Sequence, residues 1–476
     1  MHKTVLKVGG SNLKSIEDFS RIISLMKTYE RPVILVVSAF YGVTDCLEKA
    51  VSDESYAGEL LEYLHRVHRL VLERYIIDKD RIVRASEELT VCLSALEELL
   101  SSKERHQVAT INEILSFGEK LSARVIQALL DANAVACRLA LPEEIGFVSN
   151  QRFYQGSILL KKSSHNLKKH LNADVTWVVP GFYAISEQGK TVLLGRGGTD
   201  YSAACLAHCV GASYLDVWKD VEGYLSGDPK IISGVKKISH LSYQEAAELS
   251  YFGAKILHPR TIRPLVSKRI QVRLFNPEKH LEPGIRNEAT RISYKTTTGK
   301  EVIKSVTSDE DVALLKLKGS GVGIKKGILA EVTGAFDKAH INIRSVVTSQ
   351  TAIHFIFSRT NLQAAKQIVD EINRNLDFDT EIDDDIAWVA AVGQGINQKE
   401  GVAARIFTAL AKADINVQQI VLGASEVAIY FVVQRKLVSK AVQSIHQEIF
   451  NLFWVNSPPL AAKNNKFVHG TKQVYS

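Results

Sequence analysis

The stretch GRGGTDYSAA, residues 195–204, decides how the middle of this chain folds. The apolar run 191–194 before it predicts a strand, and residues 203–212 after it predict a helix. Glycines at such a turn let the backbone approach a bound anion, and the N–H groups at the start of the helix point toward it. Arg196 can bind a carboxylate through two hydrogen bonds, and Asp200 can hold a metal or orient donors. The turn therefore suggests phosphoryl transfer that involves a carboxylate, although glycine turns of this kind also occur as purely structural elements.

A second glycine turn lies close to the N-terminus. Residues 4–8 (TVLKV) predict a strand, and Gly9-Gly10-Ser11-Asn12 follows it directly. Lys7, at the end of this strand, can reach the phosphates of a nucleotide and neutralise charge during transfer. The spacing is that of neither a Walker A loop nor a dinucleotide fingerprint. Taken alone, Lys7 could equally be a surface lysine before a tight turn.

Residues 1–290 alternate apolar strand-like runs with helical patterns, which predicts a three-layer α/β domain with a mainly parallel sheet. The further strand candidates are residues 32–39, 177–185, 192–194, 214–217 and 270–275. Ligand-binding loops are expected at the carboxyl ends of such strands. Apolar stripes at helical spacing predict a helical, substrate-side lobe over about 57–131, and the polar segment 291–305 is interpreted as a linker.

The C-terminal part contains an internal repeat. Residues 327–348 align with residues 401–422 at a constant offset of 74, and 8 of the 22 aligned positions are identical. Each copy predicts a strand, a glycine, an amphipathic helix, an Ile-Asn turn and another strand. We therefore expect two related modules, at 306–385 and 386–456, followed by a disordered tail at 457–476.

Composition narrows the class of protein. The chain has 476 residues, with 46% hydrophobic and 23% charged residues, which fits a globular protein of two or three domains. No apolar run reaches the length of a membrane span, and the net charge of +7 is spread without a basic stripe, so neither membrane nor nucleic acid is expected as a partner. Five scattered cysteines and a first strand starting near residue 4 predict a cytoplasmic protein without a leader peptide.

Cys205, His208 and Cys209 are of residue types that can bind a metal. These residues lie on an apolar helix after the glycine turn, and no second pair of ligands follows at zinc spacing. They are interpreted as ordinary helix residues, and no protein-bound metal site is predicted.

Six motifs in order resemble those of the aspartate kinases, a group within the amino acid kinase family. They lie at residues 7–11 (KVGGS), 37–39 with 42–45, 116–122 (SFGEKLS), 195–201, 218–223 with 227–229, and 245–249 with 252–259. The repeat resembles tandem ACT domains, which are ferredoxin-like (βαββαβ) amino-acid-sensing modules. The resemblance covers most of the chain. It implies transfer of the γ-phosphoryl group of ATP, used with Mg²⁺, to the β-carboxylate of L-aspartate, and assembly into a dimer or tetramer.

The resemblance also implies roles for individual residues. Lys7 would stabilise the transferring phosphoryl group and Asp200 would order the lysines or metal-bound waters. Arg196 would bind the substrate α-carboxylate, and Glu119 would bind its ammonium group. The remaining substrate-side positions are Ser38, Thr44, Gly197, Gly198 and Thr199, and the nucleotide-side positions are Gly9, Gly10, Ser11, Lys219, Asp220, Leu225, Lys230, Lys255 and Ile256.

Some positions depart from the family pattern. Many relatives have threonine, tyrosine and arginine where this chain has Lys219, Leu225 and Lys230, which is closer to the plant-type single-function enzymes. Lysine-inhibited relatives commonly have an aspartate at the position of Arg344 and a glutamate at that of Gln350. An arginine would repel a bound ammonium group, so lysine is expected to inhibit weakly, to bind differently or to be replaced by another effector. The expected effector positions are Lys326, Gly327, Asn342, Arg344, Ser349 and Gln350.

Two alternatives stay open at this point. The first is another enzyme of the same fold, such as a glutamate 5-kinase, against which Arg196, the motif at 252–259 and the ACT pair argue. The second is an amino-acid sensor without catalysis, against which Lys7, Glu119 and Asp200 argue. Because the sequence ends at 476, a single-function enzyme without a fused homoserine dehydrogenase is expected.

Overall fold

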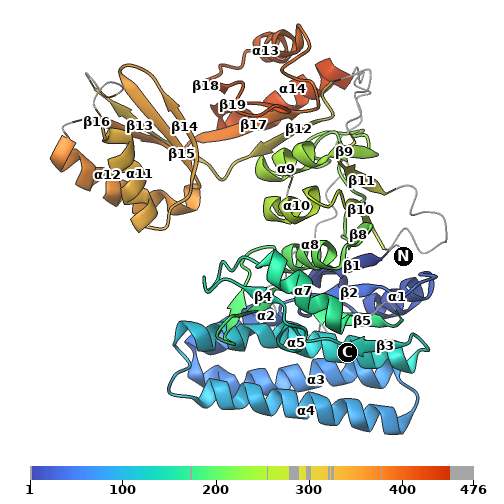
Figure 1. Ribbon diagram of the computed structural model, residues 1–476. Helices are drawn as coiled ribbons and strands as arrows, with labels where there is room; N and C mark the ends of the chain where they lie inside the picture. The colour runs from blue at the N-terminus through green and yellow to red at the C-terminus, as the bar shows by residue number, and fades with distance from the viewer. Residues whose placement is uncertain are drawn as a thin grey trace.

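The computed structural model describes residues 3–171, 174–254, 256–277, 289–295, 302–319, 322, 326–376 and 378–450, with backbone only at 372–376. Figure 1 shows an α/β domain in the middle, a layer of long helices below it, and two smaller modules above it. The predicted tail at 457–476 and the centre of the predicted linker, residues 296–301, lie outside the described residues.

An eight-stranded sheet forms the middle of the α/β domain. Its strands, in spatial order, are β3 (Cys137–Leu139), β5 (Thr176–Pro180), β2 (Ile34–Val37), β1 (Thr4–Val8), β8 (Tyr214–Trp218), β10 (Gln271–Phe275), β11 (Thr290–Ser293) and β9 (His240–Ser242). All neighbouring pairs run parallel except β10 and β11. The apolar run on β1 is buried on both faces because helices cover both, as expected for a parallel sheet.

Successive residues of β1 point into two different hydrophobic cores. Val5 packs with the core that contains helix α8 (Gly198–Val210), and Leu6 packs with the core on the opposite face. The other helices of this domain are α1 (Ile16–Lys27), α2 (Val43–Ser52), α6 (Pro142–Ile145), α7 (Leu160–His170), α9 (Tyr243–Tyr251) and α10 (Pro259–Val266). The long α8 packs against β1, β2 and β8, so its first turn lies at the carboxyl ends of these strands.

Three long helices occupy the region where a helical lobe is predicted. They are α3 (Ala57–Tyr75), α4 (Lys79–Ser101) and α5 (Val108–Ala132). Helix α5 lies between the other two and the sheet in Figure 1, and it contacts α2, β5 and β7. This helix is therefore the element that brings side chains of the lobe to the sheet.

The single strand predicted at 177–185 is wrong. The chain forms β5 up to Pro180 and then β6 (Tyr183–Ser186), which pairs with β4 (Val148–Ser149) and β7 (Thr191–Leu193) in a separate small sheet. The break falls at Gly181 and Phe182, where φ of Phe182 is +68°. A Cβ at Gly181 would lie 2.6 Å from Thr199 Cγ2, so the bend lets the backbone pass close to the start of α8.

The helix predicted at 203–212 begins earlier than expected. Helix α8 starts at Gly198, and its N-cap Gly197 is in the left-handed region with φ +70°. The sequence pattern hid this because the first turn is polar, whereas the apolar part starts at Ala203. As a result, Thr199 and Asp200 lie in the first turn of a helix and not in a loop.

The C-terminal part forms two four-stranded antiparallel modules. The first has the order β14 (Ile343–Thr348), β15 (Ala352–Phe357), β13 (Ala313–Lys318) and β16 (Asp379–Asp383), with α11 (Ile328–Lys338) and α12 (Leu362–Leu376). The second has the order β12 (Ser305–Asp309), β17 (Ile386–Val392), β19 (Ala428–Gln434) and β18 (Gln419–Val421), with α13 (Val402–Lys412) and α14 (Val438–Phe450). The N-caps Gly327 and Gly401 both have positive φ, so the 74-residue repeat is also a structural repeat.

The predicted module boundaries need a correction. Strand β12 falls at the predicted start of the first module, but it pairs antiparallel with β17 in the second. The first module, β13 to β16, is therefore inserted between two neighbouring strands of the second. The predicted linker is also too long, because its start, residues 291–293, belongs to β11 of the large sheet. Short, polar strands explain both errors, since TRIS and SVTSD carry little apolar pattern.

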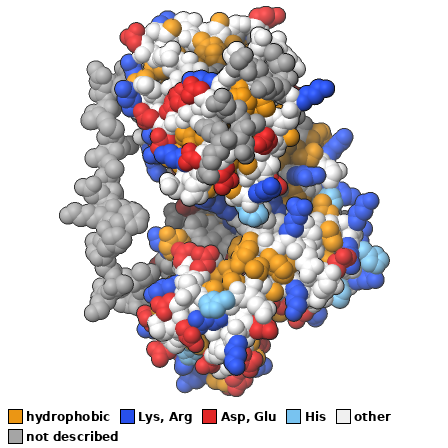
Figure 2. All heavy atoms as spheres, turned by 90° about the vertical axis from the view of Figure 1, so that its left-hand side faces the viewer, with side chains coloured by type: hydrophobic (Ala, Val, Ile, Leu, Met, Phe, Trp, Pro, Cys, Tyr) orange, Lys and Arg blue, Asp and Glu red, His pale blue; other side chains and the backbone are white. Residues whose placement is uncertain are grey.

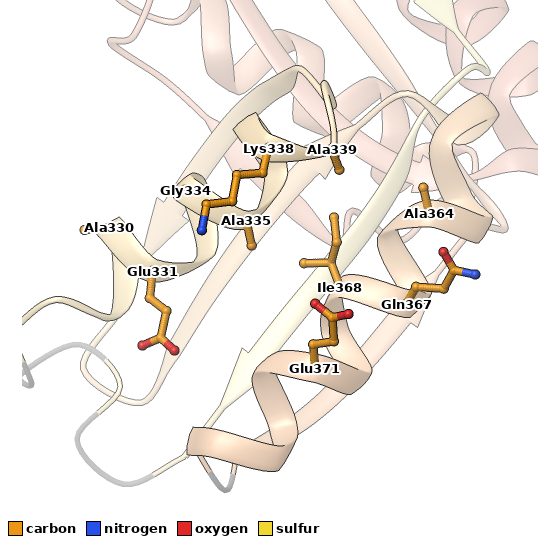
Figure 3. Close-up of a pocket in the computed structure, with 10 residues that line it drawn as sticks. All are labelled: Ala330, Glu331, Gly334, Ala335, Lys338, Ala339, Ala364, Gln367, Ile368 and Glu371. Carbon is orange, nitrogen blue, oxygen red and sulfur yellow. The ribbon is translucent and has the colours of Figure 1, made fainter.

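The surface carries both signs of charge. On the face shown in Figure 2, basic and acidic side chains are interspersed, and no large area of one sign appears. Helices α11 and α12 leave a cavity of about 610 Å³ between them, lined mainly by small side chains together with Glu331, Lys338 and Glu371 (Figure 3).

Candidate active site

The candidate active site lies at the carboxyl ends of β1, β2 and β8. Val8, the last residue of β1, pairs with Val37 of β2 and with Trp218 of β8. The chain leaves β1 toward β2 on one side and returns on the other side at β8, which makes this position a topological switch point. Ligands of open α/β sheets bind in the crevice at such points.

A buried carboxylate between two lysines forms the centre of the site. Asp200 accepts contacts from Lys7 Nζ at 2.7 Å and from Lys219 Nζ at 3.1 Å. Lys7 and Asp200 are almost fully buried, whereas Lys219 retains 20% of its side-chain exposure. The three side chains come from the end of β1, the first turn of α8 and the residue after β8. The cluster has a net positive charge and lies next to the positive end of the α8 dipole, so it suits an anionic ligand.

Burial and neighbouring charges act in opposite directions on the pKa values of Lys7 and Asp200. Burial lowers the pKa of Lys7 to about 8, although Asp200 beside it acts to raise that pKa. Burial alone would raise the pKa of Asp200, but the charges of the two lysines outweigh it and the pKa lies below its usual value. Asp200 is therefore an ionised carboxylate that orders two ammonium groups and is not a general base.

The turn after β1 is shaped around Lys7. A Cβ on Gly9 would lie 2.6 Å from Lys7 Nζ, and one on Gly10 would lie 3.3 Å from the Ala39 carbonyl. A side chain at either position would crowd the site, so glycine leaves both the lysine and an incoming anion room. Ser11, within the short 3-10 helix Gly10–Asn12, is exposed.

Two hydroxyl groups meet across the site. Ser38, directly after β2, donates a hydrogen bond of 2.9 Å from its Oγ to Thr199 Oγ1 in the first turn of α8. Thr44 lies in the first turn of α2, half-buried, behind Gly42 with φ +80°. The structure thus brings together Ser38 and Thr199, and it places Thr44 at the start of a neighbouring helix.

Glu119 is the buried carboxylate of the helical lobe. It lies on α5, is 4% exposed, and has no hydrogen-bond partner at Oε2. Burial raises its pKa to about 8, against a smaller lowering by the backbone N–H of Ala39, which connects it to the β2 end of the site. A Cβ on Gly118 would lie 2.8 Å from Ala39 Cβ, so this glycine lets α5 approach the loop after β2. The ionised form of this buried group needs a cationic partner, and a ligand can provide it.

The backbone of the glycine-rich turn adopts conformations that favour glycine. Gly195 and Gly197 have φ of +78° and +70°, which strain any other residue. A Cβ on Gly197 would lie 2.7 Å from His258 Cβ, and one on Gly198 would lie 2.8 Å from Phe182. Arg196 is exposed at the tip of this turn, where its guanidinium is accessible to a ligand.

Sequence reasoning missed Arg260, which holds this turn in place. Arg260 donates from Nη1 to the Leu194 carbonyl at 2.9 Å and from Nη2 to the Gly156 carbonyl at 2.6 Å. Its guanidinium also lies 4.5 Å from the centre of the Tyr201 ring. The available signal was its position, immediately after the sixth motif. Asn112 was missed as well: its Oδ1 accepts a 2.8 Å hydrogen bond from the Leu193 N–H and so fastens the end of β7 to α5.

The residues expected to bind the nucleotide are spread over several segments of the chain. Lys219 belongs to the central cluster, but Asp220 and Lys230 are exposed. The Leu225 carbonyl accepts a hydrogen bond from Ser305 Oγ of β12, which ties this loop to the second C-terminal module. Ile256 is partly buried between the end of α9 and the start of α10, and Lys255 lies outside the described residues.

The expected effector positions do not gather at one place in the first module: Asn342 and Arg344 lie at the start of β14, whereas Ser349 and Gln350 follow its end. Lys326, Asn342, Ser349 and Gln350 are exposed, and Gly327 caps α11. Arg344 differs from them, because its Nη1 lies 2.7 Å from Asp309 Oδ2 and its Nη2 donates to the Tyr251 carbonyl at 2.8 Å. Its guanidinium also lies 4.6 Å from the centre of the Trp388 ring. Arg344 therefore joins the first module to the second module and to α9, and its charge is balanced by Asp309.

The ion pair between Arg344 and Asp309 is expected to contribute to the free energy of unfolding. Arg344→Ala should lower the free energy of unfolding by about 3 kcal/mol, because it leaves the largely buried Asp309 carboxylate unpaired. The measurement is urea unfolding followed by circular dichroism. The control is Arg359→Ala, which removes an exposed arginine of the same module and should leave the curve unchanged. Equal curves for the Arg344 variant and the unchanged protein would contradict the interdomain role.

No metal cluster is apparent within the part of the chain that the structure describes: no group of three or more His, Cys, Asp or Glu side chains could hold an ion there. Cys205 and Cys209 are buried in α8, and His208 Nδ1 contacts the Pro264 carbonyl at 2.8 Å. Among the described helices, none combines the length and the apolar character needed to cross a bilayer.

The chain matches two known kinds of protein domain. The profile of the amino acid kinase family matches residues 2–276, and profiles of ACT domains match residues 321–377 and 389–449. The large sheet with its site is thus an amino acid kinase domain, and the two C-terminal modules are ACT domains.

Similar proteins narrow the class further. Aspartokinase 1 of Arabidopsis thaliana is 30% identical over 467 residues, which are 94% of this chain and 80% of that protein. A bifunctional aspartokinase/homoserine dehydrogenase of Haemophilus influenzae is also 30% identical, but the chain covers only 56% of its length. Escherichia coli aspartokinase III, solved in complex with aspartate and ADP, superimposes with a TM-score of 0.76 at 25% identity, over 94% of this chain and all of that one. The chain belongs to the aspartokinases of the amino acid kinase family.

Proposed function

We propose that this protein is an aspartate kinase, which transfers the γ-phosphoryl group of ATP to the β-carboxylate of L-aspartate. The observation that supports this most directly is the buried Lys7–Asp200–Lys219 cluster at the switch point of the sheet, together with the buried Glu119, whose Oε2 has no hydrogen-bond partner. A site for a polyanion and a site for an ammonium group are what ATP and an amino acid require. The E. coli relative, solved with aspartate and ADP, supports the same assignment.

The nucleotide phosphates would bind at the two lysines. Lys7 and Lys219 supply charge, and the backbone of Gly9 and Gly10 with the first turn of α8 supplies N–H donors. We assign the outer positions to the rest of the nucleotide and to the phosphate rim: Ser11, Asp220, Leu225, Lys230, Lys255 and Ile256. The connection of Leu225 to β12 places this rim next to the second ACT domain.

Aspartate would bind between α5 and the glycine-rich turn. We assign its ammonium group to Glu119 and its α-carboxylate to Arg196, whose exposed guanidinium can form two parallel hydrogen bonds. The backbone at Gly197 and Gly198 and the hydroxyls of Ser38, Thr44 and Thr199 would complete the pocket for the β-carboxylate. Arg260 would act as a positioning residue through the turn that carries Arg196.

The residues fit Mg²⁺ carried on the nucleotide. Mg²⁺ is usually held by one or two carboxylates together with substrate phosphates and water, and Asp200 is a single ionised carboxylate at the phosphate site. The metal would supply charge neutralisation at the transferring group. Asp200 would orient Lys7, Lys219 and water molecules around it.

The chemistry needs little proton transfer. The β-carboxylate is ionised at neutral pH and is itself the nucleophile. One of its oxygens forms a bond to the γ-phosphorus as the bond from that phosphorus to the β,γ-bridging oxygen breaks, which gives 4-phospho-L-aspartate and ADP. Lys7 would stabilise the charge on the transferring group, so catalysis rests on alignment and electrostatics.

The test of this function is ADP release by the full chain with Mg-ATP and L-aspartate. Turnover that depends on aspartate supports the proposal, and L-glutamate serves as the control substrate. Turnover with glutamate and not with aspartate would reassign the substrate, and a lack of turnover with either would leave a sensor without catalysis.

The raised pKa of Glu119 predicts a pH dependence. At a pH below about 8 the free enzyme holds this group protonated and neutral, and the ammonium group of aspartate needs the carboxylate. With saturating ATP, so that phosphate keeps Lys7 charged, kcat/KM for aspartate should rise about tenfold per pH unit up to pH 8 and then level off. A profile that is flat between pH 6 and 8 would contradict ammonium binding by Glu119.

Regulation and assembly complete the proposal. We infer that an amino-acid effector binds the ACT domains and that they pair in a homo-oligomer. Escherichia coli aspartokinase III has been solved with lysine. In this chain Arg344 stands where lysine-inhibited relatives commonly have an aspartate, and it occupies Asp309, so neither residue offers a free carboxylate to a bound ammonium group and we expect weak inhibition by lysine. We place the enzyme in the cytoplasm, at the first step of the pathway from aspartate to lysine, threonine and methionine.

A further inference from the structure

A second cavity lies between the catalytic domain and the second ACT domain. It has a volume of about 310 Å³ and is lined by Ala247, Glu248, Tyr251 and Phe252 at the end of α9, by Pro259, and by Ala424, Ser425 and Tyr430 of the second ACT domain. Two domains therefore contribute to one cavity. It is separate from the active site and from the exposed effector positions of the first ACT domain.

The walls of this cavity are aromatic. The rings of Phe252 and Tyr430 have centroids 4.6 Å apart, and Tyr251 packs edge-on against Phe252 at 5.2 Å. Phe252 and Tyr430 are buried, although they line an open volume. Faces of aromatic rings carry negative electrostatic potential, and the Tyr251 ring has the Arg344 guanidinium 5.1 Å from its centre, which shows that this wall accommodates a cation.

Among the described residues that line the cavity, Glu248 is the one with a formally charged side chain. Burial raises its pKa, against a smaller lowering by a hydrogen bond with Ser425 across the domain boundary. Among the described residues, no lysine, arginine or histidine forms an ion pair with it at 4.0 Å or less. The described residues that line the cavity include no basic side chain, so these walls offer an anionic ligand no cationic partner.

We propose that this interdomain cavity binds a small organic cation with a primary ammonium group. The ammonium group would pair with Glu248, and the alkyl part would pack on Tyr251, Phe252 and Tyr430. The inference does not depend on the kinase reaction, since none of these residues has a role in the active site proposed above.

The residues around this cavity connect it to the first ACT domain and to the glycine-rich turn of the active site. Tyr251 donates from its hydroxyl to the Arg344 carbonyl at 2.8 Å, so the cavity wall is part of the contact with the first ACT domain. Pro259 lies between His258, which packs against Gly197, and Arg260, which holds the glycine-rich turn. A bound cation would thus touch Tyr251, which contacts the first ACT domain. It would also touch Pro259, which lies between the two residues that pack against or hold the glycine-rich turn.

The test is isothermal titration calorimetry of the full chain with n-butylammonium chloride, with 1-butanol as the uncharged probe. We expect saturable binding of butylammonium and at least about tenfold weaker binding of butanol. Glu248→Gln should weaken butylammonium binding about tenfold or more, as should Ala247→Leu, which fills the cavity but keeps the carboxylate.

The matched control is Glu426→Gln. Glu426 lies in the same loop as Ser425, is exposed, and faces Gln244 instead of the cavity. This variant should bind butylammonium like the unchanged chain, and far-UV circular dichroism should show all variants folded. Equal binding by the Glu248 variant, equal binding of butanol, or no heat up to 20 mM butylammonium (about the weakest binding that a single ion pair supports) would each overturn the proposal.

Discussion

Replacing Lys7 by methionine is expected to lower kcat about 10³-fold while both KM values change little. Lys7 is held by Asp200 at 2.7 Å, at the end of β1, where it can meet charge that develops on the transferring phosphoryl group. A group that acts mainly in the transition state affects kcat more than binding. Lys219 remains in the variant and keeps part of the charge for ground-state binding of ATP. The measurement is the initial rate of ADP release at saturating ATP and aspartate.

The control for this prediction is Lys27→Met. Lys27 is an exposed lysine in the last turn of α1, far along the helix from the site, and its loss should leave kcat unchanged. Because Lys7→Met leaves buried Asp200 with one lysine, circular dichroism has to show that the variant is folded. A folded Lys7→Met protein with kcat within tenfold of the original would show that Lys7 is not part of the catalytic machinery.

At a pH above 8, where Glu119 is ionised, Glu119→Gln is expected to lower kcat/KM for aspartate roughly 100-fold and to leave KM for ATP unchanged. The amide keeps the shape of the side chain in its buried position on α5, but it cannot balance the charge of an ammonium group. The variant should also lose the rise of kcat/KM between pH 6 and 8, because the group that titrates is gone. Initial rates over a range of aspartate concentrations at several pH values measure both effects.

Glu97→Gln is the matched control, since Glu97 is an exposed carboxylate on α4 of the same helical lobe. It should retain both the activity and the pH profile. If Glu119→Gln kept the pH-dependent rise, another group would have to be responsible for it, and the ammonium site would need a different assignment.

The catalytic domain was largely predictable because its elements have strong local patterns. The apolar runs that became β1, β8 and β10 and the stripes of the helical lobe are each encoded within a few residues. The errors lie where tertiary contacts decide. Strand β5 ends at Pro180 because the backbone of the next residue, Gly181, passes close to Thr199, and β12 joins β17, a strand that follows about 80 residues later.

In the active site, too, some residues were predictable from local sequence and others were not. Lys7, Asp200 and Lys219 stand in recognisable motifs, and the structure brings them together. The supporting residues are not visible in this way, since Arg260 and Asn112 act through hydrogen bonds to backbone carbonyls and N–H groups of distant turns. Arg344 shows the limit most clearly: in the sequence it is an unbalanced charge at an effector position, whereas in the fold Asp309 neutralises it.

Strand β12 precedes the first ACT domain in the chain but belongs to the sheet of the second. Asp309 pairs with Trp388 in the second ACT domain, and Leu314 pairs with Asp383 in the first, so the chain enters and leaves the first ACT domain at neighbouring points. A domain attached in this way behaves as a cassette: a different sensor could be grafted between residues 310 and 385 while the parent sheet stays continuous. Gene rearrangement could therefore change the metabolite that such an enzyme detects without rebuilding its catalytic half.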